Sequence, residues 1–130
     1  MYVLDSNSVI HLFNGRGGVT KNFLRTSPQE ISIPAVALYE LETGIAKSSS
    51  PDKRRAQLDD LLSLLTVLSF GPPEARASAR IRADLERRGL PIGPLDTLIA
   101  GTALSRGATL VTHNTREFAR VEGLSLVDWF

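Results

Sequence analysis

The chain has 130 residues, 42% of them hydrophobic, and a formal net charge of +1 at pH 7. That length suits one core, so we expect a single domain over residues 1–130, and the small net charge excludes a global basic field. Neither a run of about 18 apolar residues nor a secretory signal pattern is present, so we expect a cytoplasmic protein without a membrane span.

Apolar runs, helix caps and glycine stops predict an alternation of short strands with helices. We expect strands at 2–4, 31–33, 67–70, 109–112 and 124–127. We expect helices at 6–14, 19–24, 34–47, 51–65, 74–88, 95–106 and 115–118. Pro34 and Pro51 are placed in first helical turns, with Ser50 as the N-cap before Pro51. Gly15 and Gly89 are expected to end their helices.

The predicted order of elements is βααβααβααβαβ. Strands that alternate with helices indicate a mainly parallel central sheet with helices on both faces, which is a three-layer α/β/α fold. In such sheets, ligands bind beyond the carboxyl ends of the strands. Side chains that follow the strands are therefore the first candidates for a functional site.

Three carboxylates lie in apolar surroundings or at a strand end. Asp5 ends the first strand, although capping the next helix would also explain it. Glu40 lies within a largely apolar helical stretch, where an exposed helical position is the simple alternative. Asp96 opens an apolar helix, and the helix dipole alone would stabilise an acid there by about 0.3–1 kcal/mol.

A fourth polar group follows the fourth strand and consists of Thr112, Asn114 and Glu117. The predicted fold brings this group, Asp5 and the two acid-bearing helices to one edge of the sheet. Like charges about 5 Å apart at an effective dielectric near 20 repel by about 3 kcal/mol a pair. Such a cluster persists only if a cation neutralises it or some of the acids stay protonated.

The residue types restrict which cation could bind. Cysteine is absent, and His11 and His113 are the only histidines. Oxygen ligands must therefore dominate, which favours Mg²⁺ or Mn²⁺ over zinc. An ion held by carboxylates with open water positions suits phosphodiester hydrolysis. A phosphatase would need an Asp-x-Asp nucleophile or a glycine-rich phosphate loop, and neither signature is present.

Four blocks stand in order along the chain: VLDSN at 3–7, LYELETG at 38–44, GPLDTLIA at 93–100 and LVTHNTREF at 110–118. They resemble the motifs of PIN-domain ribonucleases, specifically the VapC-type toxins of bacterial toxin–antitoxin pairs. The resemblance continues through 121–124 to Asp128 and Trp129. It covers essentially the whole chain and implies a PIN-like fold and Mg²⁺-dependent endoribonuclease activity, with Mn²⁺ as a substitute.

The resemblance also implies roles for the acids. Asp5, Glu40 and Asp96 would form the acidic triad, with Asp5 and Asp96 as direct metal ligands. Many PIN domains carry Asp where this chain has Asn114, which removes one charge. Glu117 would then supply the fourth acid, directly or through water. Residues expected to orient ligands or water are Asn7, Thr112 and Asn114.

Other residues leave alternatives open. His113 would touch phosphate, shuttle a proton, or simply occupy a solvent-facing turn. Arg116, Arg80 and Arg87 are candidates for holding RNA phosphates, with surface solvation as the alternative for each.

The implied partners are a homodimer mate and a VapB-like antitoxin that blocks the acidic cleft, with operator DNA reached only through the antitoxin. The implied substrate is RNA, with tRNA as the candidate. The apolar stripes at 9–13 and 58–65 are candidate antitoxin grooves, with core packing as their alternative. The alternative function is that of a PIN-like module working mainly in an antitoxin-containing, DNA-binding regulatory complex.

Overall fold

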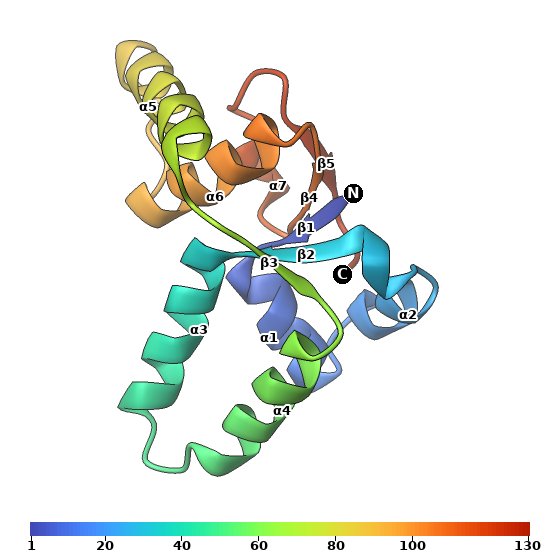
Figure 1. The fold of residues 1–130 in the computed structure, drawn as a ribbon. Helices are drawn as coiled ribbons and strands as arrows, with labels where there is room; N and C mark the ends of the chain where they lie inside the picture. Colours follow the sequence, from blue (N-terminus) through green and yellow to red (C-terminus); the bar gives the residue numbers. More distant parts are fainter.

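A computed structural model describes all of residues 1–130 as a five-stranded, all-parallel sheet flanked by helices (Figure 1). The strands are β1 (Tyr2–Leu4), β2 (Ile31–Pro34), β3 (Thr66–Leu68), β4 (Thr109–Val111) and β5 (Ser125–Val127). The α-helices are α1 (Ser6–Asn14), α2 (Val19–Leu24), α3 (Ala35–Lys47), α4 (Asp52–Leu62), α5 (Pro72–Arg87), α6 (Pro94–Ser105) and α7 (Thr115–Phe118). A single 3-10 turn, η1 (Pro28–Glu30), precedes β2. The predicted fold class and element order are confirmed.

The strand order places β1 and β4 side by side in the middle of the sheet. That order is β3-β2-β1-β4-β5. The chain therefore adds β2 and β3 on one side of β1, and then β4 and β5 on the other side. Leu4 of β1 pairs with Val111 of β4, which sets the residues after these two strands level with each other. A reversal of this kind opens a crevice at the carboxyl edge, where open α/β sheets bind ligands.

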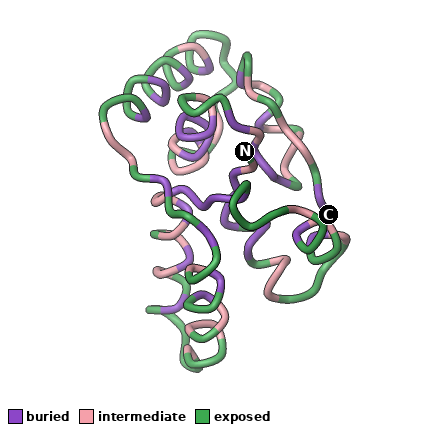
Figure 2. The backbone as a smooth tube through the Cα atoms, turned by 45° about the vertical axis from the view of Figure 1, so that its right-hand side comes forward, coloured by how far each residue is buried: buried purple, intermediate pink, exposed green.

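The helices are distributed unevenly about the sheet. In Figure 1, α5 and α6 lie on one side of the sheet and α1 lies on the other, while α3 and α4 extend away as a helical hairpin. The fully buried residues Val3, Leu4, Leu110 and Val111 form the centre of the apolar core. Figure 2 shows the buried segments gathered along the strands and the helix faces turned toward them. None of the helices is long and apolar enough to cross a membrane.

Several helix boundaries follow the predicted signals, and others differ. Gly15 and Gly89 adopt left-handed backbone conformations, with φ of 63° and 68°, at the predicted helix stops. Pro34 instead ends β2, because it pairs with Leu68 of β3 and keeps an extended backbone. Pro51, not Ser50, is the N-cap of α4, with no side-chain capping bond.

The predicted 51–65 helix is also shorter than expected, because α4 ends at Leu62. Its stripe is core rather than groove: Leu58, Leu61 and Leu65 are at most 7% exposed. In the other predicted stripe, Val9 is fully buried and Leu12 and Phe13 pack against the core, whereas Ile10 is exposed. Most residues of both predicted stripes therefore belong to the core or pack against it.

The position of α6 depends on a close contact with α5. A methyl group built on Gly101 would lie 1.9 Å from Oγ of Ser78 and 2.8 Å from its backbone nitrogen. Only glycine therefore allows the two helices to approach this closely. Since α6 carries Asp96 in its first turn, this contact helps to set where that carboxylate lies.

Candidate active site

Asp5 lies at the junction of β1 and α1, where both of its predicted roles are visible. Its side chain is 5% exposed, and Oδ1 accepts a 2.8 Å hydrogen bond from the Ser8 amide as the N-cap of α1. Its own amide donates to the Val111 carbonyl at 3.2 Å, which fixes the residue against the end of β4. The cap uses Oδ1 alone, so Oδ2 has no protein donor and can accept a ligand.

Glu40 is half-buried on α3 and is held by Ser6, the first residue of α1. The Ser6 hydroxyl donates a 2.5 Å hydrogen bond to Oε1 of Glu40. The bond joins α1 to α3 across 34 positions of sequence. Because Ser6 directly follows Asp5, it brings the Glu40 carboxylate to the side of the crevice that Asp5 occupies.

Asp96 is half-buried in the first turn of α6. Its carboxylate lies back over Gly93, with Oδ2 3.4 Å from the position of a Cβ built on that glycine. Burial is the largest cause, followed by the negative charges of Glu40, Asp5 and Glu117 in that order, and together they raise the pKa of Asp96 to about 6. The charges of the other three predicted acids therefore all act on Asp96.

Glu117 is positioned by the turn that follows β4. Thr112 is fully buried, and its Oγ1 accepts a 3.0 Å hydrogen bond from the Asn114 amide. The Asn114 side-chain amide then donates to Oε2 of Glu117 at 3.0 Å. Asn114 thus orients a carboxylate rather than supplying one. Asn7, expected in a similar orienting role, is exposed on α1.

The four acids differ from the other acids in their lack of positive partners. Among the remaining buried or half-buried carboxylates, each forms an ion pair: Glu42 with Arg55 at 2.7 Å, Glu74 with Arg106 at 3.6 Å and Asp84 with Arg88 at 2.7 Å. Asp5, Glu40, Asp96 and Glu117 form none. Their charge is left uncompensated by the protein in a partly buried place, which favours a bound cation.

The chemistry of this donor set fits Mg²⁺ or Mn²⁺, because it consists of carboxylate oxygens with excess negative charge. The side chains do not yet form a metal site, because no three acidic or histidine side chains lie close enough together to hold one metal ion. The hydrogen bonds from Ser8 to Asp5 and from Ser6 to Glu40 show what holds two of them in place. The arrangement therefore provides the charge for a cation without a completed coordination shell.

The histidine and arginine candidates are exposed, and two of them pair with acids outside the group of four. His113 is half exposed on its turn, as expected, but its Nδ1 lies 2.9 Å from Oδ2 of Asp128 and its ring stacks on Phe130. Burial tends to raise the pKa of Asp128, but the hydrogen bond with His113 leaves it lowered. The candidate arginines, all exposed, are Arg80, Arg87 and Arg116. Arg87 also pairs with Asp84 at 2.6 Å.

Comparison with known proteins identifies the family. The PIN domain model matches residues 2–124. The tRNA(fMet)-specific endonucleases VapC of Shigella flexneri and Salmonella typhimurium are 38% and 35% identical over 128 residues, covering 98% of this chain and 97% of theirs. The chain therefore belongs to the PIN-domain family, and to its VapC-type members in particular.

Solved structures agree with this assignment. VapBC2 from Rickettsia felis, bound to a DNA fragment from its promoter, matches with a TM-score of 0.92 at 33% identity, covering 99% of this chain and 98% of that one. DNA-bound VapBC from Salmonella typhimurium matches with the same TM-score and coverage at 36% identity. The predicted family and its α/β/α fold are both confirmed.

Proposed function

We propose that this chain is a metal-dependent endoribonuclease that acts as the toxin of a toxin–antitoxin pair. The observation that carries the proposal is a group of four buried or half-buried acids without positive partners, in which the charges of Asp5, Glu40 and Glu117 all act on Asp96. Relatives named as ribonucleases and as tRNA(fMet)-specific endonucleases support RNA as the substrate class, with tRNA as the candidate.

Asp5 and Asp96 would hold Mg²⁺ directly, and Glu40 and Glu117 would complete the site directly or through water. When bound, the ion supplies an activated water and stabilises negative charge on the phosphate and the leaving oxygen. The Ser6 hydroxyl holds Oε1 of Glu40 and leaves Oε2 without a donor. That oxygen can accept a proton from the attacking water. The Asn114 amide keeps Glu117 turned toward the same region.

Substrate contact would come from exposed arginines around the acidic crevice. Arg116 lies beside Glu117 on α7, and Arg87 lies at the end of α5, one short loop before α6. Arginine binds phosphate through a planar, bidentate fork, which suits an RNA backbone. Arg80 lies two turns earlier on α5 and would contact RNA farther from the acids.

The proposed partners are a VapB-like antitoxin and a second copy of the chain. Solved relatives are VapBC complexes, which supports the antitoxin. A groove of about 190 Å³ beside Glu40 has Ile10, Leu41 and Ile45 among its lining residues. An apolar segment of antitoxin seated there would also cover Glu40, which suits inhibition by helix-in-groove binding. Operator DNA would be reached through the antitoxin.

A second candidate function is regulatory. Two similar structures are complexes bound to DNA, so the chain would act mainly as a module of a DNA-binding assembly. This role needs the fold and the antitoxin groove but does not need the acids. Replacing Asp96 by Asn would then leave growth and DNA-complex formation unchanged, whereas the nuclease proposal predicts loss of toxicity with DNA-complex formation retained.

Expression of the chain alone in bacteria tests the toxin proposal. The wild-type chain should arrest growth, and new RNA 5′ ends should appear after brief induction. The Asp5→Ala variant should allow growth and generate none of these ends. Asp60→Ala removes an exposed carboxylate from α4 and should stay toxic. Equal growth with the wild-type chain and with Asp5→Ala would contradict the toxin proposal.

A further inference from the structure

Arg120 connects three segments of the chain through three different groups. Its backbone amide donates to the Glu117 carbonyl at 3.1 Å and closes the turn after α7. Its backbone carbonyl accepts a hydrogen bond from Nη2 of Arg88, at the end of α5. Its guanidinium donates from Nη1 to the Pro91 carbonyl at 3.1 Å, in the loop between α5 and α6.

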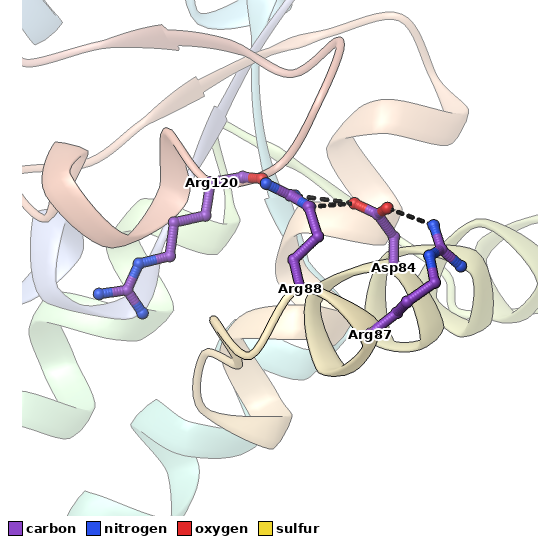
Figure 3. A network of polar contacts seen from close by, with 4 residues as sticks. All are labelled: Asp84, Arg87, Arg88 and Arg120. Atoms are coloured by element: carbon purple, nitrogen blue, oxygen red, sulfur yellow. Dashed lines mark hydrogen bonds and ion pairs between the residues drawn. The ribbon is translucent and has the colours of Figure 1, made fainter.

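The Arg88 side of this connection is itself fixed. Nε and Nη2 of Arg88 both donate to Oδ2 of Asp84, at 3.0 and 2.7 Å, and the other Asp84 oxygen accepts from Arg87 (Figure 3). The side chains of Arg88 and Asp84 are only 32% and 28% exposed. Arg88 is therefore held in a defined geometry, unlike a freely rotating surface arginine.

The joined segments carry two of the four acids. The loop that contains Pro91 leads into α6, where the Gly93 carbonyl accepts from the Thr97 amide at 2.9 Å and from the Thr97 hydroxyl at 3.0 Å. The loop is thus tied to the helical turn that bears Asp96. On the other side, Glu117 belongs to the turn that ends at Arg120. Their carboxylates repel each other, so the two segments need a contact that opposes separation.

We propose that Arg120 is a positioning residue that keeps the Asp96 and Glu117 segments from separating, so that both carboxylates are available to one divalent cation. The proposal rests on the proposed metal-dependent function and deepens it. Arg120 acts through its guanidinium on the Pro91 loop and through its carbonyl on Arg88, without contacting the ion. Groups hydrogen-bonded directly to metal ligands typically contribute 10- to 100-fold to metal affinity, and Arg120, which acts through the backbone, is expected at the lower end of that range.

The test measures metal binding without RNA. Mn²⁺ is titrated calorimetrically into the wild-type chain and into Arg120→Met, which keeps side-chain length but removes the donor. The variant should bind Mn²⁺ about tenfold more weakly. Arg120→Lys, which retains one donor, should recover part of the affinity. Arg25→Met is the matched control, because Arg25 is exposed and forms no ion pair, and it should bind like wild type.

Two further measurements separate positioning from other roles. In the metal-free Arg120→Met chain, amide hydrogen exchange should accelerate in the 89–93 loop and after α7. The KM for RNA at saturating Mg²⁺ should stay within about twofold of wild type. If Arg120→Met does not fold, Arg88→Met removes the bond to the Arg120 carbonyl and should weaken Mn²⁺ binding in the same direction.

The outcomes distinguish this proposal from the proposed function. Unchanged Mn²⁺ affinity in a folded Arg120→Met chain, with normal binding by wild type, overturns the positioning role alone. A raised KM for RNA with unchanged Mn²⁺ affinity also overturns it and makes Arg120 an RNA contact. A wild-type chain that does not bind Mn²⁺ contradicts the metal-dependent function and the positioning role together.

Discussion

The Ser6 hydroxyl donates a 2.5 Å hydrogen bond to Oε1 of Glu40 and so connects the first turn of α1 with α3. Asp5, the residue before Ser6, directly follows β1 and caps the same helix. One short stretch of chain therefore supplies an acid to the crevice and holds a second acid from another helix. The Ser6 hydroxyl therefore orients the Glu40 carboxylate.

The first prediction concerns this bond. Ser6→Ala should lower RNA cleavage about tenfold at limiting Mg²⁺, because Glu40 loses the donor that orients it. The free energy of unfolding should change by only about 1 kcal/mol, the usual value of one hydrogen bond. Ser6→Thr keeps the hydroxyl and should retain most activity. Cleavage by Ser6→Ala at the wild-type rate across a Mg²⁺ titration would show that the bond has no role in the site.

The second prediction concerns the stability of the metal-free chain with pH. Asp96 has a pKa of about 6 in the folded chain against an ordinary value of 3.8. Between these values the folded state binds more protons than the unfolded state, so the free energy of unfolding should fall as pH rises. The side chain of the Asp96→Asn variant cannot ionise, so its free energy of unfolding does not fall with pH for this reason. At pH 7.5 it should be more stable than wild type by about 1 kcal/mol, after allowance for solvent screening.

Urea denaturation in EDTA checks this prediction at both ends of the pH range. Below about pH 3, where Asp96 is protonated in both the folded and the unfolded state, the advantage of Asp96→Asn should vanish. Added Mg²⁺ at pH 7.5 should stabilise the wild-type chain more than the variant, since ligands that bind only the folded state stabilise it. A variant less stable than wild type at pH 7.5 without metal would identify Asp96 as a structural cap.

The third prediction concerns the contact between α5 and α6. Gly101→Ala would place its methyl group 1.9 Å from Oγ of Ser78 and 2.8 Å from its backbone nitrogen. The helices must then separate, which should cost about 2 kcal/mol of stability or more and displace Asp96. Gly44→Ala, within α3 and with nothing inside 4 Å, should instead stabilise by about 0.5–1 kcal/mol. Thermal unfolding of both variants provides the measurement, and equal stability would refute the close packing.

The fold was predictable where the signal is local. Gly15 and Gly89 mark helix ends because their left-handed backbone disfavours other residues, and that preference is visible in sequence. Pro34 was misplaced because proline suits both a first helical turn and the end of a strand. Its pairing with Leu68, more than thirty positions away, decides between them. Strand order was not predictable for the same reason.

The residues of the candidate site were likewise predictable only where the signal is local. Asp5 and Asp96 stand out because the first is an acid at the end of an apolar strand and the second is an acid at the start of an apolar helix, and both patterns are visible in a single sequence. Ser6 was missed because its role depends on Glu40, which only the folded chain brings to it. Arg120 was missed because its partners are mostly backbone carbonyls. A contact with main-chain oxygen leaves no trace in residue identity.

The most direct test of the metal-dependent nuclease account is RNA cleavage by the purified chain under control of metal. With a bulk tRNA substrate, cleavage should be absent in EDTA, return with Mg²⁺ or Mn²⁺, and stay absent for Asp96→Asn at every metal concentration. Asp60→Ala should match wild type, which excludes an effect of general charge loss. Undiminished cleavage in EDTA, or by Asp96→Asn, would contradict a cation held among these four acids.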